Sequence, residues 1–224
     1  MPISKPSNPQ DSFTLRDIVS PSLLTALFLL GVAYVFEHFA NIYAFAYSLR
    51  PTSNHVGDII LDAIPVIDLN FIIIEGALIT IVLGTLLVFS KPRYVLFSLK
   101  ALAVFIIIRA IFISLTHVGI HPDNIIPGLG FFDGVYLYLN FQTGLFFSGH
   151  TGLPFLFALI FWKKPLVRCI LLSVSFVFGV AVLFAHIHYS IDVFAAPFMA
   201  YGIFKIARYL FPRDYELIAP ASRA

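Results

Sequence analysis

The chain has 224 residues, of which 59% are hydrophobic and 12% are charged, whereas roughly 25% are charged in soluble domains. This composition excludes an ordinary soluble domain and indicates an all-α, polytopic membrane protein. The formal net charge of +2 gives no reason to expect a nucleic-acid partner, and the single cysteine, Cys169, excludes an intrachain disulfide.

Six apolar segments are predicted to cross about 30 Å of hydrocarbon as helices. They lie at Leu23–His38, Phe71–Phe89, Val95–Thr116, Leu145–Trp162, Leu166–Ala185 and Ile191–Phe211. The first has no clear small-residue cleavage site, so we expect it to be a retained span and not a signal peptide. The sequence therefore predicts a six-helix transmembrane domain over residues 21–211, between an N-terminal tail at 1–20 and a C-terminal tail at 212–224.

Basic residues segregate to one side of this predicted topology. They are Lys5 and Arg16 before the first span, Lys91 and Arg93, Lys163, Lys164 and Arg168 in two alternate loops, and Lys205, Arg208, Arg213 and Arg223 at the end. Because Lys and Arg in short loops are retained in the cytoplasm, both tails are predicted to be cytoplasmic. Lys100, inside the third span, is expected to extend its amine back to this side.

Ionisable residues gather at the opposite, non-cytoplasmic face. His150 begins the fourth span, His188 and Asp192 begin the sixth, and Arg109 lies about two turns below the outer end of the third. A charged group inside a span costs at least ~2.5 kcal/mol, so such groups are usually paired and line a cavity. Glu75 in the second span lies at a similar depth and is the expected partner of Arg109, unless Arg109 binds a substrate phosphate.

The spacing of His188 and Asp192 suits nucleophilic catalysis. If residues 188–192 are helical, positions i and i+4 share a face, and the Asp192 carboxylate can accept the Nδ1–H of His188. The Nε2 atom is then unprotonated and oriented, which makes His188 a credible nucleophile. His150 lies at the predicted N-terminus of a helix and can protonate the oxygen of a leaving group.

Ser148, Gly149 and Thr151 surround His150 at this helix start. Glycine permits close approach of the backbone, and unpaired N–H groups at a helix start can face an anion such as phosphate. Ser148 and Thr151 can equally act as helix caps, and the sequence leaves both roles open.

At these residues the chain resembles the type-2 phosphatidate phosphatase superfamily, and most strongly its sphingomyelin synthase branch. FFSGHTG (146–152) is similar to the FSGHT block of that branch, and AHIHYSIDVFAA (185–196) to its AHxHYTxDVxxA block. Arg109 and Thr116 are similar to two positions of an RxxxxxxTxLPxP block.

The resemblance implies a triad of His150, His188 and Asp192 that passes a phospho-headgroup through a phosphohistidine, with no metal or other cofactor. Arg109, Ser148, Gly149 and Thr151 are the predicted phosphate-binding residues, and Glu75, Tyr189 and Thr116 are predicted to support them. The expected partners are membrane lipids, namely a phospholipid donor and a diacylglycerol or ceramide-like acceptor. The domain at 21–211 would then be catalytic, with its active site on the non-cytoplasmic face of a cell membrane.

Departures from the superfamily patterns bear on the substrate. The Lys-x6-Arg-Pro block of the lipid phosphatases is absent, Val182 stands where they have an Arg, and Gln142-Thr143-Gly144 replaces the CGD triplet of the sphingomyelin synthases. A phosphate monoester carries about −1.5 to −2 charges, so a site with one Arg better suits a phosphodiester. This favours headgroup transfer or phospholipase C-like cleavage over a phosphatidate-type monoester phosphatase.

Other readings of the same residues stay open. Glu75, Arg109 and His150 could form the relay of a small ion or proton-coupled transporter. His186 and His188 could bind a metal together with His150 and Asp192.

The residues of two predicted outer loops give weaker indications of function. Asp58, Asp62 and Asp68 are expected to be solvated, or else to steer a cationic headgroup by their charge. The aromatic residues of the loop at 117–144 are expected to lie along the membrane interface, or more weakly to form a gate for acyl chains.

Overall fold

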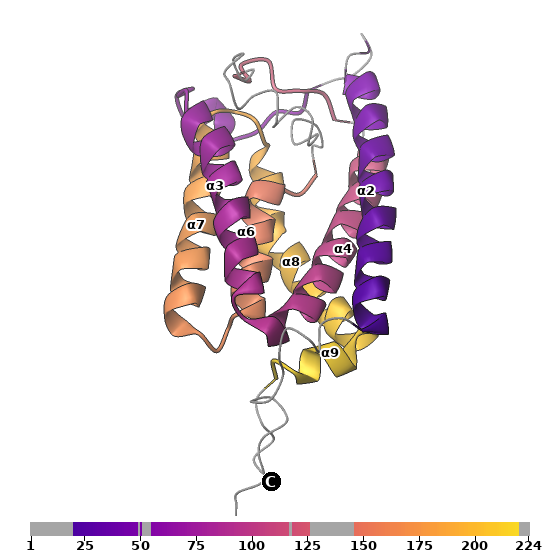
Figure 1. The fold of residues 1–224 in the computed structure, drawn as a ribbon. Helices are drawn as coiled ribbons and strands as arrows, with labels where there is room; N and C mark the ends of the chain where they lie inside the picture. The colour runs from indigo at the N-terminus through magenta and orange to yellow at the C-terminus, as the bar shows by residue number, and fades with distance from the viewer. Residues whose placement is uncertain (1–19, 49, 51–54, 117, 126–145, 220–224) are drawn as a thin grey trace, which may run out of the picture.

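The computed structural model describes residues 20–48, 50, 55–116, 118–125 and 146–219, and within these ranges it contains helices and no strands. The elements are α2 (Pro21–Ser48), the 3-10 helix η1 (Leu61–Ala63), α3 (Asn70–Phe89), α4 (Pro92–Leu115), α6 (Gly149–Ile160), α7 (Pro165–Phe184), α8 (Ser190–Leu210) and α9 (Pro212–Glu216). Figure 1 shows α2 and α4 on one side of the bundle, α3 and α7 on the other, and α6 and α8 between them. The predicted class, an all-α polytopic membrane protein, is confirmed.

Five of the described helices, α2, α3, α4, α7 and α8, are long and apolar enough to cross a membrane. The fourth predicted span is different, because α6 has 12 residues. At 1.5 Å per residue it is ~18 Å long, which is too short for ~30 Å of hydrocarbon. The predicted fourth span is therefore present as an apolar helix that is shorter than expected: the Ser148 cap begins it late, and a turn that starts at Phe161 ends it.

The beginning of α2 and the end of α8 lie at the same end of the bundle (Figure 1). The Ser22 hydroxyl donates to Asp214 Oδ1 at 2.8 Å, and Lys100 Nζ contacts Asp214 Oδ2 at 2.6 Å and Ser22 Oγ at 2.7 Å. Lys100 is 5% exposed, so it does not extend to the surface as expected but forms a buried ion pair. The loops that carry Lys91 and Lys163 share this end, whose cytoplasmic location stays a prediction.

Small side chains bring α2 against α4. Ala26, Ala33 and Ala40 recur every seven residues along α2 and are 0, 0 and 5% exposed, and Ala40 packs with Ala110 and Ile113 of α4. Alanine lets two helices approach closely where lipid offers no hydrophobic drive for association. Because Glu37 lies between Ala33 and Ala40 in this seam, its side chain is directed toward α4.

Aromatic packing joins α4, α6 and α8 into the main core. Tyr94 stacks on Phe161 with ring centroids 4.4 Å apart, and Phe105 meets Phe147 edge-on at 5.4 Å. Gly152 of α6 faces Phe105, and a Cβ at this position would lie 3.2 Å from the ring. This close approach holds the first turn of α6 against the outer half of α4.

Candidate active site

His188 and Asp192 form a hydrogen-bonded pair at the start of α8. Nδ1 of His188 lies 3.4 Å from Oδ2 of Asp192, and the two residues are 6% and 1% exposed. His188 itself precedes the helix, so the assumed helical conformation of residues 188–192 is wrong, although the predicted contact is present. The contact arises because Asp192, in the first turn, folds back to accept the backbone N–H of Tyr189 at 3.2 Å.

His150 lies close to this pair because the N-termini of α6 and α8 adjoin. The backbone N–H of Ser148 donates to the carbonyl of Asp192 at 3.0 Å, which ties the two helix starts together. The ring centroids of His150 and His188 are consequently 6.3 Å apart. The structure thus brings His150 close to the His188–Asp192 pair. The catalytic roles of the three residues stay a prediction.

The residues beside His150 have a capping role. Ser148 is the N-cap of α6, and its Oγ accepts the backbone N–H and the hydroxyl of Thr151, both at 3.4 Å. Ser148 and Thr151 are 0% and 5% exposed. Capping is therefore observed for Ser148, whereas Thr151 supplies the N–H and the hydroxyl that the cap accepts; contact of either with a substrate phosphate stays a prediction.

Arg109 of α4 reaches the same helix entrance. A Cβ on Gly149 would lie 3.4 Å from Arg109 Nε, so the guanidinium packs directly against the backbone of Gly149. Arg109 also forms an ion pair with Glu37 of α2, with the two side chains 11% and 19% exposed. The predicted pairing with Glu75 is wrong, because α2 and not α3 lies against this face of α4.

Glu37 is a residue of the site that the sequence reasoning missed. It is an acidic residue within the apolar first span, and the cost of burying a charge there could have identified it. Hydropathy alone could not show that α2 packs beside α4.

An apolar cavity of about 350 Å³ leads away from this polar cluster. It runs between α3, α4 and α6, from Arg109 to Ser98 on α4, a length of ~16 Å at 1.5 Å per residue. Glu37, Arg109, Gly149 and His150 are among its lining residues, and most of the others are apolar. His150 lines the cavity. His188 is not among the lining residues, and its ring lies beside that of His150.

Two predicted supporting residues make structural contacts. The Thr116 hydroxyl caps the end of α4 by donating to the carbonyl of Phe112 at 2.7 Å. The Tyr189 hydroxyl donates to the carbonyl of Gly119 at 2.9 Å and accepts the backbone N–H of Val56 at 3.2 Å. Burial raises the pKa of Tyr189 above its ordinary value, so its phenol stays protonated. Tyr189 joins the segments that carry Val56 and Gly119 to the start of α8.

Asp58 is not the solvated loop acid that was expected. It is 6% exposed and accepts the backbone N–H groups of Ser190 at 2.6 Å, Ile60 at 3.0 Å and Leu61 at 3.3 Å. Burial alone would raise the pKa of Asp58, but these hydrogen bonds together hold it below its ordinary value of 3.8. Its carboxylate anchors the first turn of α8. Of the loop at 117–144, only residues 118–125 are described, so its aromatic residues lie outside the described part.

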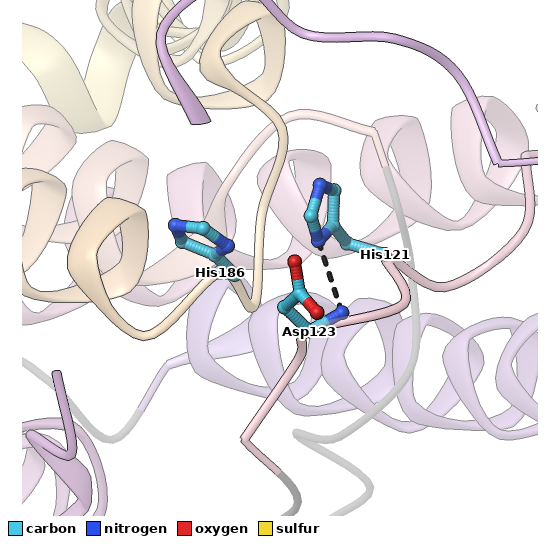
Figure 2. Close-up of side chains that lie close together, drawn as sticks. All are labelled: His121, Asp123 and His186. Carbon is cyan, nitrogen blue, oxygen red and sulfur yellow. Dashed lines mark hydrogen bonds between the residues drawn. The ribbon is translucent and has the colours of Figure 1, made fainter. Parts of the chain in front are cut away.

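A second cluster of possible metal ligands lies outside the His150 and His188 pair. Figure 2 shows His121 and Asp123 from the loop after α4 beside His186 from the turn between α7 and α8. One ligand atom from each lies within 4.8 Å of the others. The considered metal site that combined His186 with His188 is wrong, because His186 contacts His121, with ring centroids 4.9 Å apart.

The fold and the site define an integral membrane protein in which His150 and Arg109 line one end of an apolar cavity and the His188–Asp192 pair adjoins His150. Residues 143–209 match the family model described as PAP2 superfamily C-terminal. This range includes His150, His188 and Asp192, and it supports membership of the type-2 phosphatidate phosphatase superfamily. No curated protein matches the chain. The match supports a membrane enzyme of the lipid phosphatase and phosphotransferase type.

Proposed function

We propose that the protein transfers or cleaves a phospholipid headgroup through a phosphohistidine intermediate. The observation that carries this proposal is that His150 and Arg109 line one end of an apolar cavity, while the His188–Asp192 pair lies directly beside His150, with the two histidine ring centroids 6.3 Å apart. A phospholipid has the matching shape, with a charged phosphate at one end and acyl chains at the other. The 3.4 Å contact between Arg109 and the Gly149 position places a cation beside His150, where a phosphate would be held.

In the first step, His188 is the nucleophile. Its Nδ1–H donates to Asp192, which leaves the lone pair of Nε2 for attack on phosphorus. The bond between phosphorus and the glycerol oxygen breaks, and His150 donates a proton to that oxygen. Diacylglycerol leaves, and the headgroup phosphate stays bound to His188.

In the second step, an oxygen nucleophile attacks the same phosphorus atom. His150, now neutral, accepts the proton of the attacking hydroxyl, and the bond between phosphorus and His188 breaks. A lipid alcohol such as a ceramide-like acceptor gives headgroup transfer, and water gives phospholipase C-like cleavage. The active site is expected on the non-cytoplasmic face, where this end of the bundle is predicted to lie.

The Glu37–Arg109 pair favours a phosphodiester substrate. The charge of Arg109 is offset by Glu37, so these two lining residues contribute no net positive charge to the cavity. A diester with one negative charge suits such a site better than a monoester with about −1.5 to −2 charges. The phosphatidate-type phosphatase is therefore the second candidate, supported by the superfamily match.

The test is turnover by purified protein reconstituted in vesicles. Phosphatidylcholine, phosphatidylethanolamine and phosphatidic acid with identical labelled acyl chains would be supplied with and without ceramide, and products identified by mass spectrometry. We expect labelled diacylglycerol from a diester, and a ceramide-linked headgroup if transfer occurs. His188→Ala should abolish turnover, whereas His55→Ala, a change at an exposed histidine of an outer loop, should not.

Three results separate the alternatives. Release of inorganic phosphate from phosphatidic acid alone would favour the monoester phosphatase. Phosphate found on His150 instead of His188 in quenched protein would reverse the two histidine roles. Turnover that persists in both His150→Ala and His188→Ala would refute the phosphohistidine mechanism, and proton or ion flux in protein-containing vesicles would then favour the transporter.

A further inference from the structure

A buried histidine with no well-formed hydrogen bond lies two residues before His188. His186 is 3% exposed, and within the described part of the chain neither of its ring nitrogens makes a hydrogen bond of good geometry, although the backbone of Ile64 lies close to the ring. Its backbone adopts φ of 53°, which is uncommon for any residue except glycine. Burying an imidazole without a partner is unfavourable, and a strained backbone often accompanies a functional role.

The groups around His186 are suitable metal ligands. His121 presents its Nδ1 edge toward Asp123 and His186 (Figure 2). This Nδ1 accepts the backbone N–H of Asp123 at 3.2 Å, so it is the unprotonated nitrogen that can bind a metal. One possible ligand atom from each of His121, Asp123 and His186 lies within 4.8 Å of the other two.

We propose that His121, Asp123 and His186 bind one divalent transition-metal ion, best matched by zinc, which joins the loop after α4 to the turn between α7 and α8. Two imidazole nitrogens and a carboxylate oxygen are ligands that zinc accepts, and three protein ligands leave a fourth tetrahedral position for water. The metal would exchange the weak Nδ1 hydrogen bond of His121 for a coordinate bond, and it would give the buried ring of His186 a partner.

Hydrogen bonds already hold the same two segments together on either side of this cluster. The Tyr189 hydroxyl donates to the carbonyl of Gly119, and the backbone N–H of Ile125 donates to the carbonyl of Ala185 at 3.2 Å. An ion between them would fix the turn that carries His188. The ion itself takes no part in phosphoryl transfer, because the pair of His188 and Asp192 is separate from the three ligands.

Metal binding can be measured without any activity assay. Full-length protein without a polyhistidine tag would be purified in detergent, treated with chelator, and titrated with Zn²⁺ and with Co²⁺. We expect one equivalent per chain by elemental analysis, Co²⁺ absorption bands of a four-coordinate site, and a Zn²⁺-dependent rise in melting temperature. His186→Gln and His121→Gln should each weaken Zn²⁺ binding by at least about tenfold, the effect that even outer partners of a ligand can have.

Matched variants locate the ion. His55→Gln, in an exposed outer-loop position, should bind Zn²⁺ like the parent. His188→Gln should also bind it, whereas loss of binding in this variant would place the metal at the catalytic pair and overturn the proposal. Asp123→Asn changes an exposed ligand, so its replacement leaves the core intact. If both Asp123→Asn and His186→Gln bound Zn²⁺ as tightly as the parent, the proposal would be overturned. A parent protein that binds no Zn²⁺ would do the same.

Discussion

Removing the carboxylate of Glu37 should change which phosphate esters the enzyme prefers. In Glu37→Gln the side chain keeps its size and a hydrogen-bonding oxygen, but the charge of Arg109 is no longer offset. The protein would then present a net positive group beside Gly149 and His150. We expect the rate for a monoester to rise relative to that for a diester.

The magnitude follows from the charges and their separation. A phosphate held on the Gly149 side of the guanidinium would lie ~7 Å from the Glu37 carboxylate, and at an effective dielectric constant of ~20 that repulsion is ~2 kcal/mol per unit charge. A monoester carries about 0.5 to 1 more negative charge than a diester. The change in relative kcat/KM should therefore be ~1–2 kcal/mol, or about 5- to 30-fold in favour of the monoester.

The assay compares kcat/KM for phosphatidic acid and phosphatidylcholine with the same acyl chains, in mixed micelles at fixed surface concentration. Asp62→Asn is the matched control, because it removes an exposed acid from an outer loop. Its effect should be small and lost at high salt, whereas the effect of Glu37→Gln should persist, since buried charges are poorly screened. An unchanged ratio in Glu37→Gln, or an equal change in Asp62→Asn, would refute this electrostatic reasoning.

Three further predictions concern the ion pair of Lys100 with Asp214, Gly149 at the start of α6, and the buried carboxylate of Asp58. Lys100→Met should lower the free energy of unfolding, measured in detergent, by ~3–5 kcal/mol, because it leaves the buried carboxylate of Asp214 without its partner charge. Adding Asp214→Leu should recover most of this loss. Gly149→Ala should lower kcat/KM by up to about tenfold, because the new methyl group, 3.4 Å from Arg109 Nε, fills the space beside the guanidinium where we expect the phosphate to bind. Gly202→Ala, with nothing within 4 Å of its Cβ, should leave kcat/KM unchanged. The pKa of Asp58 is lower in the folded protein than its ordinary value of 3.8. Its carboxylate therefore stabilises the fold above pH 3.8, and this contribution is lost as the pH falls through the folded-state pKa. Below about pH 4, the melting temperature of the parent should fall more steeply than that of Asp58→Asn.

Each of these has a result that contradicts it. A double variant at Lys100 and Asp214 no more stable than Lys100→Met would mean that the pair is not the source of the loss. Equal kcat/KM for Gly149→Ala and Gly202→Ala would remove the argument for close contact at the helix entrance. Parallel melting curves for the parent and Asp58→Asn across acidic pH would show that Asp58 does not link folding to pH.

The membrane class and the contact between His188 and Asp192 could be predicted from the sequence. Apolar runs are a local property of the chain, and every predicted span corresponds to a helix. His188 and Asp192 are four residues apart, so a single local turn of the chain is enough to bring their side chains together. Even here the reason differed from the expectation, because a folded-back carboxylate and not a helical turn makes the contact.

The lateral neighbours of each helix were decided by the tertiary structure. Glu37 and Glu75 are both acids at plausible depths, and only the packing of α2 on α4 selects Glu37 as the partner of Arg109. The pairing of Lys100 with Asp214, and the meeting of His121 with His186, likewise join segments far apart in the chain. Hydropathy specifies which residues enter the membrane, but it carries no information about which helix lies beside which. The order of helices around the bundle therefore depends on how their side chains fit together.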